Sequence, residues 1–272
     1  MANIGKCCIC GQNRILTKEH VPPQSAYNKQ KTYLLGAKEM FGKDWLPPWK
    51  LSLKGGRQYQ GGVFFETLCG KCNNFSGGCY GKAFLDFATQ GFSYLKRIEE
   101  DHLAGKIKIN FYKIHPLKIL KQIIAMFASI NSPDFFTAEE ELRKFVLNNE
   151  KIGLPDQNYG LYLYFLTGTI GRYVGIQGIL NIKRGESRII SELSHPPFGF
   201  VLELNPKKTD YYCNINFFSK FKYNEEKNLS LKIPVLESNT PYPGDYRTKQ
   251  RIFDDYIKGK ILSKNDAKAN KR

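Results

Sequence analysis

The sequence lacks the features of a membrane, secreted or nucleotide-hydrolysing protein. It contains no run of about 18 apolar residues, the length needed to cross a bilayer, and its N-terminus lacks the apolar stretch of a secretory signal. No G-x-x-x-x-G-K-[ST] loop and no G-x-S-x-G elbow occurs, which argues against a P-loop NTPase and an α/β-hydrolase. We therefore expect cytoplasmic localisation and no membrane partner.

Acidic side chains are scarce relative to basic ones. The chain has 25 Asp and Glu against 41 Lys and Arg, a net charge of +16, and residues 1–95 are the more densely basic part. Such a charge attracts polyanions, and nucleic acid is the expected one, DNA before RNA. A lysine-rich surface that serves solubility alone is the alternative at this point.

The chain is predicted to form two units of an α+β protein. Residues 1–95 are rich in cysteine and paired glycines, which favours loops and a metal site, and the segment from Pro23 to Val63 is predicted to be an ordered insertion. Residues 96–272 are predicted to form an α+β accessory domain, a helical segment followed by a mostly antiparallel sheet, that serves target recognition, partner binding or assembly. The predicted helices cover 82–100, 116–130, 138–148 and 246–262, and the predicted strands cover 161–167, 173–182, 188–193, 198–204, 212–218 and 229–235.

The cysteine spacing predicts a structural zinc site. Cys7 and Cys10 form one C-x2-C pair, and Cys69 and Cys72 form another. Cysteines of a cytoplasmic chain are normally reduced, so metal ligation is favoured over a disulfide framework. Four thiolates saturate a tetrahedral Zn²⁺ and leave no open position for chemistry. The long gap between the two pairs has room for a catalytic insert.

Inside that gap the sequence reads Glu19-His20-Val21-Pro22, and Asn73 and Asn74 directly follow the last cysteine. A C-x2-C pair, an acidic residue followed by His, and a second C-x2-C pair followed by Asn together resemble the zinc-containing HNH, or ββα-metal, endonucleases. The resemblance covers roughly residues 5–90 and none of the remainder.

The resemblance implies a ββα module that grips one catalytic divalent ion. It implies that Glu19 and Asn73 ligate this ion, with Asn74 as the fallback ligand, and that His20 deprotonates the attacking water. A carboxylate and an amide oxygen suit Mg²⁺ or Mn²⁺, and a neutral imidazole suits a base near pH 7. One position departs from the family, because Phe64 stands where members often carry an Asn that braces the hairpin and the base. A backbone carbonyl of the insertion, or Glu66, would have to orient His20 instead.

The function implied is a metal-dependent DNA endonuclease, similar to bacterial restriction, mobile-element or antiphage-defence nucleases. Two alternatives stay open: a non-catalytic, zinc-dependent nucleic-acid-binding module, and a nuclease subunit that is active only with a partner protein. Divalent-dependent cleavage by the isolated chain would support the endonuclease. Salt-sensitive binding without cleavage would support the first alternative, and cleavage only with a copurifying partner would support the second.

Overall fold

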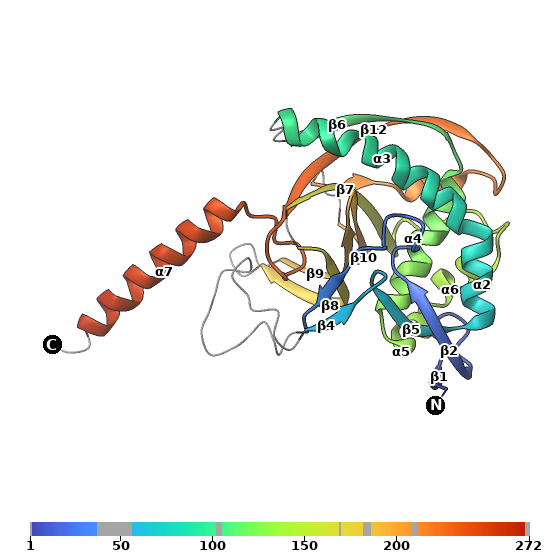
Figure 1. The fold of residues 1–272 in the computed structure, drawn as a ribbon, viewed down its shortest axis with the longest axis horizontal. Helices are drawn as coiled ribbons and strands as arrows, with labels where there is room; N and C mark the ends of the chain where they lie inside the picture. The colour runs from blue at the N-terminus through green and yellow to red at the C-terminus, as the bar shows by residue number, and fades with distance from the viewer. Residues whose placement is uncertain are drawn as a thin grey trace.

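The computed structural model describes residues 2–36, 56–101, 105–168, 170–181, 186–207 and 211–269. Much of the expected insertion, residues 37–55, lies outside these ranges. Within them the chain is a mixed α+β protein with a mostly antiparallel sheet, as the sequence predicts (Figure 1).

A seven-stranded sheet forms the centre of the described part of the chain. Six strands lie in the order β6-β12-β7-β10-β9-β8, and the short β11 pairs with β7. β12 runs parallel to β7, and the other neighbouring pairs are antiparallel. The strands are β6 (Gly105–Ile114), β7 (Tyr159–Gly168), β8 (Arg172–Asn181), β9 (Glu186–His195), β10 (Phe198–Leu204), β11 (Cys213–Asn214) and β12 (Lys227–Ser238).

Helix α4 (Pro116–Ile130) is the centre of the core. It begins at a proline, which suits the first helical turn, and nearly all of its side chains are buried. The predicted helix 116–130 is therefore confirmed. Around it lie α5 (Pro133–Ala138), α6 (Glu140–Leu147) and the 3-10 helix η3 (Asn216–Lys220).

The N-terminal part is a small antiparallel sheet followed by a long helical run. Its strands are β1 (Ile4–Lys6), β2 (Asn13–His20) and β5 (Phe64–Cys69), in the order β1-β2-β5, while β3 (Thr32–Leu34) pairs with β4 (Arg57–Tyr59). The helical run comprises α2 (Gly70–Ser76), a π-helical turn η2 (Gly77–Gly81) and α3 (Lys82–Asp101).

One hydrophobic core joins this N-terminal part to the large sheet. It includes Cys7 and Leu68 near one end, Phe87 of α3 in the middle, and Phe198 and Ile233 of the large sheet. The Phe87 ring stacks on Phe198 at 4.7 Å between centroids. The boundary predicted at residue 95 falls within α3, and it stays a prediction.

Helix α3 also covers the outer edge of the sheet. Edge strand β6 has no strand neighbour on its outer side within the described residues. The Gln90 side chain bonds both backbone groups of Tyr112, donating to its carbonyl at 2.9 Å and accepting from its amide at 2.8 Å. The Tyr94 hydroxyl accepts from the amide of Asn110 at 3.4 Å. These side chains occupy the groups that another strand would use.

The face of the large sheet that points away from α4 carries a buried polar cluster. Arg172 of β8 and Glu192 of β9 form an ion pair at 2.8 Å with both side chains fully buried. Glu192 also accepts hydrogen bonds from the Tyr164 and Tyr246 hydroxyls. These contacts hold the segment that precedes α7 (Lys249–Ala269), which extends away from the rest of the protein (Figure 1). None of the described helices is both long and apolar enough to cross a membrane.

The local structure differs from the predictions in several places. The predicted strand 212–218 is only the two-residue β11 followed by η3, because the Asn216 side chain bonds the backbone of Tyr159 and Leu161 and turns the chain away. Strand β6 was not predicted, although its burial alternates along most of its length as in a half-buried strand. The predicted helix 138–148 is confirmed as α6, and the short α5 before it was not predicted.

His195 links the N-terminal part to the large sheet. Its Nδ1 lies 2.9 Å from the Tyr173 hydroxyl, and its ring is hydrogen-bonded to the backbone of Tyr27. It also lines a small apolar cavity together with Pro22 and Phe198. Burial lowers the pKa of His195 to about 4, while the Tyr27 bond raises it to a smaller extent. The imidazole is therefore neutral in the folded protein at neutral pH.

This junction predicts acid sensitivity. Unfolded His195 binds a proton near pH 6.5, whereas the folded residue does so only near pH 4. The unfolded state binds more protons between these values, so the free energy of unfolding should fall by about 2 kcal/mol as the pH drops from 6.5 to 4. Urea titrations of His195→Gln should show a flatter pH dependence, whereas the His115→Gln control keeps it. Equal acid sensitivity in both variants would contradict this assignment.

Candidate functional site

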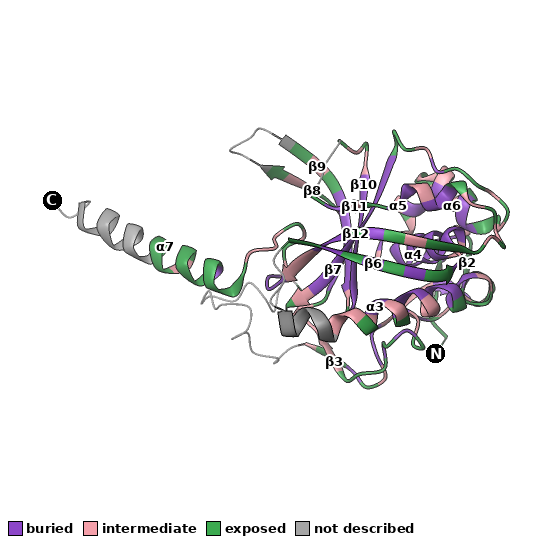
Figure 2. Ribbon diagram, turned by 90° about the horizontal axis from the view of Figure 1, so that it is seen from above, coloured by how far each residue is buried: buried purple, intermediate pink, exposed green. Residues whose placement is uncertain are grey.

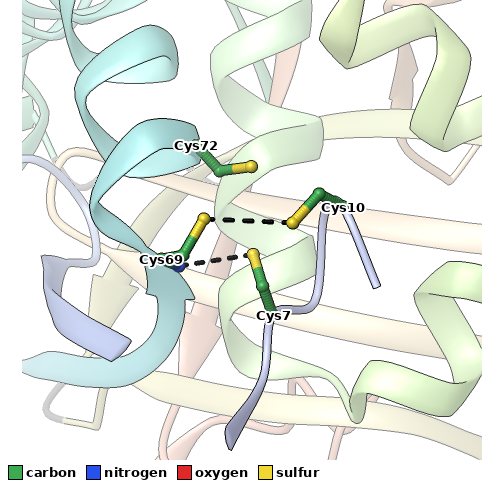
Figure 3. A group of neighbouring side chains, drawn as sticks. All are labelled: Cys7, Cys10, Cys69 and Cys72. Atoms are coloured by element: carbon green, nitrogen blue, oxygen red, sulfur yellow. Dashed lines mark hydrogen bonds between the residues drawn. The ribbon is translucent and has the colours of Figure 1, made fainter. Parts of the chain in front are cut away.

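Four cysteines meet at the base of the small sheet. Cys7 and Cys10 lie in the turn between β1 and β2, Cys69 ends β5, and Cys72 lies in the first turn of α2. Their Sγ atoms all lie within 4.8 Å of one another (Figure 3). Tetrahedral zinc with bonds of about 2.3 Å would set the sulfurs about 3.8 Å apart. The Sγ atoms of Cys10 and Cys69 are 3.9 Å apart, so the cluster could hold a zinc ion.

Backbone geometry brings the first pair into place. The amide of Gly11 donates to the carbonyl of Cys7 at 2.8 Å and closes a tight turn. Gly11 has φ of +73°, in the left-handed region that favours glycine. The amide of Cys8 donates to the carbonyl of Thr67 at 2.9 Å, and the amide of Cys69 donates to Cys7 Sγ at 3.3 Å. The turn is thereby fixed against β5.

The thiols of the cluster affect one another's ionisation. The hydrogen bond from Cys72 lowers the pKa of Cys7 to about 4, and the same bond raises the pKa of Cys72. Cys8 lies outside the cluster, as expected: its Sγ is directed to the carbonyl of Asn131 at 3.5 Å, and burial raises its pKa to about 12.

Glu19 is a buried carboxylic acid on β2. Only 6% of its surface is exposed. Burial raises its pKa to about 8. Among the described residues, no group donates a hydrogen bond to it and no cation pairs with it. A buried carboxylate without a partner is costly, and a bound cation would remove that cost.

His20 ends β2, next to Glu19 and opposite Phe64 of β5. Its ring is half-buried and lies 5.7 Å from the Phe64 ring, measured between centroids. Burial lowers the pKa of His20 below its ordinary value, a bond to the Gly61 backbone opposes this, and the charge of Lys18 adds to it. A neutral imidazole can accept a proton.

Asn73 connects α2 to β2. Its Nδ2 donates to Thr17 Oγ1 at 3.1 Å and to the carbonyl of Lys18 at 3.0 Å, directly before Glu19. Because both N–H groups are used, the remaining polar atom is Oδ1, which can only accept a bond or ligate a cation. Asn74, the fallback ligand, is exposed. The structure therefore brings Asn73 against the strand that carries Glu19 and His20.

Asn28 braces this region and was missed in the sequence. It is fully buried, and its Nδ2 donates to the carbonyls of Pro22 and Val63, both at 2.8 Å. Its Oδ1 accepts from the amide of Val63 at 2.8 Å. Asn28 thus ties the segment after His20 to the start of β5. No spacing rule could reveal it, because its partners are backbone groups and two of its three bonds reach Val63, 35 residues further along the chain.

Position 62, which lies against the backbone of Asn28, must be glycine. Gly62 has φ of +94°, and a Cβ atom there would lie 1.9 Å from the Asn28 carbonyl oxygen.

Glu66, one of the two expected supports of His20, instead accepts a hydrogen bond from Asn3 at 3.0 Å. The other expected support, a backbone group of the insertion, corresponds to Gly61.

The brace predicts a measurable loss of stability. Asn28→Ala would remove three hydrogen bonds to buried backbone groups, although the Val63 carbonyl keeps its bond from the Val21 amide, so the free energy of unfolding should fall by about 2–3 kcal/mol. Asn13→Ala, at an exposed position of β2, should change it by less than about 0.5 kcal/mol. Urea unfolding at pH 7, with zinc content measured in parallel, compares the stabilities of the two variants. Equal stability of the two variants would refute the brace.

Cationic side chains surround the Phe64 ring beside His20. Lys18 Nζ lies 4.8 Å from the ring centroid, and the guanidinium carbon of Arg57 lies 5.5 Å from it. Both side chains are exposed. A negatively charged substrate would therefore meet positive charge next to the imidazole.

No protein-family model, curated protein or solved structure matches the chain. The chemistry must therefore be inferred from the site itself: a cluster of four thiols, a buried carboxyl with no partner among the described residues, an imidazole whose pKa is lowered by burial, and an amide whose nitrogen is bonded to β2.

Proposed function

We propose that this protein is a metal-dependent endonuclease of the HNH type that hydrolyses phosphodiester bonds in DNA. One observation carries the proposal: Asn73 is anchored to β2 directly before Glu19 and His20. Glu19 and His20 lie on β2, which pairs with β5, and Asn73 lies on the helix that follows β5, which supports the roles that the family resemblance gives them.

The residues present fit a catalytic divalent ion. Glu19 offers a buried carboxylate without a partner among the described residues, and Asn73 offers an amide oxygen whose N–H groups are already bonded elsewhere. Both are hard oxygen donors of the kind that Mg²⁺ and Mn²⁺ prefer. When bound, the ion would stabilise negative charge on the phosphate and on the leaving oxygen.

The protein's own side chains supply the other steps. His20, held neutral by burial, accepts the proton of the attacking water. Lys18 and Arg57 attract the phosphate backbone to the Phe64 side of the site. Asn28 keeps the segment after His20 in place through its three backbone bonds. The four cysteines hold a structural Zn²⁺ that takes no part in the chemistry.

Incubation of the purified chain with supercoiled plasmid and Mg²⁺ or Mn²⁺ tests the proposal. We expect relaxed and linear products that require the divalent ion. Salt-sensitive binding without cleavage under any divalent condition would favour the non-catalytic binding module. Cleavage only in the presence of a copurifying protein would favour the partner-dependent subunit.

A further inference from the structure

The two strands at the edge of the large sheet present a continuous polar face to solvent. Residues alternate along β6, so that Ile107, Ile109 and Phe111 are buried. Their neighbours Lys106, Lys108, Asn110 and Tyr112 on β6 are exposed, and so are Lys232 and Ser230, which lie opposite Lys108 and Asn110 on β12. We call this surface the ribbon face, formed by Lys106, Lys108, Asn110, Tyr112, Ser230 and Lys232. In the view from above, the β6–β12 pair lies in the foreground with exposed positions alternating along it (Figure 2).

Two lysines of the ribbon face repel each other in the isolated protein. Lys232 lies directly opposite Lys108 in the register of the two strands. Like charges at directly opposed positions destabilise a strand pair. Within the described parts of the chain, neither of these lysines forms an ion pair, and none of the six residues is acidic. An anionic partner would turn this repulsion into attraction.

The shape of the ribbon face fits a duplex. On β6 the ribbon face runs from Lys106 to Tyr112, which spans about 20 Å at 3.3 Å per residue, more than half a turn of B-DNA. The major groove admits a two-stranded antiparallel ribbon. The outer edge of β6 is occupied by Gln90 and Tyr94, so the face of the ribbon is exposed while its edge is covered. Tyr112 is 61% exposed, and Asn110 and Ser230 add hydrogen-bonding groups between the lysines.

We propose that the ribbon face binds duplex DNA, with Lys108 and Lys232 contacting phosphates. This inference takes its substrate class from the proposed function and assigns the large sheet a direct share in holding the DNA. The site around His20 would then act on a DNA strand whose duplex is also bound by the ribbon face.

The test compares two variants that lose the same charge. One is Lys108→Gln with Lys232→Gln, and the control is Lys207→Gln with Lys220→Gln, two exposed lysines outside the ribbon face. Fluorescence anisotropy with a labelled duplex of about 20 base pairs, in buffer without Mg²⁺ or Mn²⁺, gives the affinity at several salt concentrations. Thermal unfolding and zinc content show whether both variants are folded.

We expect the ribbon variant to bind the duplex about tenfold more weakly at about 0.1 M salt and to lower the salt-dependence slope by about 2, close to 0.9 per lost phosphate contact. The control should keep the parent slope, and the ribbon variant should be at least as heat-stable as the parent. Affinity for the matching single strand should fall by a smaller factor.

Three outcomes would overturn the ribbon proposal: an unchanged slope, an equal loss for single and double strands, or a loss confined to binding of phosphatidylserine vesicles. His20→Ala should bind the duplex like the parent protein. Absence of plasmid cleavage by the parent protein would count against the proposed function and leave the ribbon result standing. An unchanged salt-dependence slope of the ribbon variant would count against the ribbon proposal and leave the proposed function standing.

Discussion

Replacing His20 with alanine should lower the rate of DNA cleavage by about a hundredfold or more. A positioned proton acceptor contributes about this factor, and burial keeps the His20 ring in the neutral form that accepts protons. Zinc content and DNA affinity should stay nearly unchanged, because His20 is not part of the cysteine cluster. Rates of plasmid nicking with Mg²⁺ and Mn²⁺, measured alongside anisotropy, check both parts of the expectation.

A variant of Glu19 distinguishes the loss of the metal ligand from the loss of the general base. Glu19→Gln keeps the shape of the side chain but removes the charge, so it should weaken the catalytic ion and regain part of its activity at high divalent concentration. His20→Ala should gain nothing from added metal. If His20→Ala cuts as fast as the parent under every divalent condition, His20 is not the base, and the zinc-dependent binding module becomes the better explanation.

Replacing Cys69 with serine should release the structural zinc and unfold the N-terminal part of the chain. The binding free energy of a structural zinc is largely folding free energy, so the loss should amount to about 4 kcal/mol or more. Cys213→Ser, which changes a half-buried cysteine outside the cluster, should retain the metal. Elemental analysis and urea unfolding measure the two effects, and stoichiometric zinc in Cys69→Ser would remove this residue from the ligand set.

The same variant tests the predicted division of the chain. Residues 96–272 were expected to fold as a separate unit, and a protease-resistant C-terminal fragment of Cys69→Ser would support that expectation. The contacts across the boundary are direct: the hydroxyl of Thr67 donates to the carbonyl of Ser129 at 3.0 Å, and the Tyr80 hydroxyl donates to the carbonyl of Val146 at 2.7 Å. Complete digestion would show that these contacts need the metal-bound state.

Spacing and periodicity predicted the features that depend on local sequence. The two C-x2-C pairs predicted the cluster of four cysteines, and helix α4 follows from its proline start and apolar repeat, with the observed bounds. Strand β10 likewise covers the predicted range 198–204. In these cases the residues that decide the structure are neighbours in the chain.

The features that escaped prediction depend on residues distant in the chain. Asn28 acts on Val63, and Asn216 acts on Tyr159 and Leu161, so neither role is visible in a local window. The same holds for Glu19: its position beside His20 was evident, but its burial without a partner among the described residues arises only when the whole module packs around it.

The bond of Gln90 to the Tyr112 backbone has a consequence for self-association. The side-chain amide donates and accepts as a peptide group would, so this stretch of β6 is satisfied as though a further strand were present. Two molecules that meet edge to edge here cannot extend their sheets into one another without first displacing a helix from each. The bonds to α3 thus protect this part of the lysine-rich ribbon against edge-to-edge pairing.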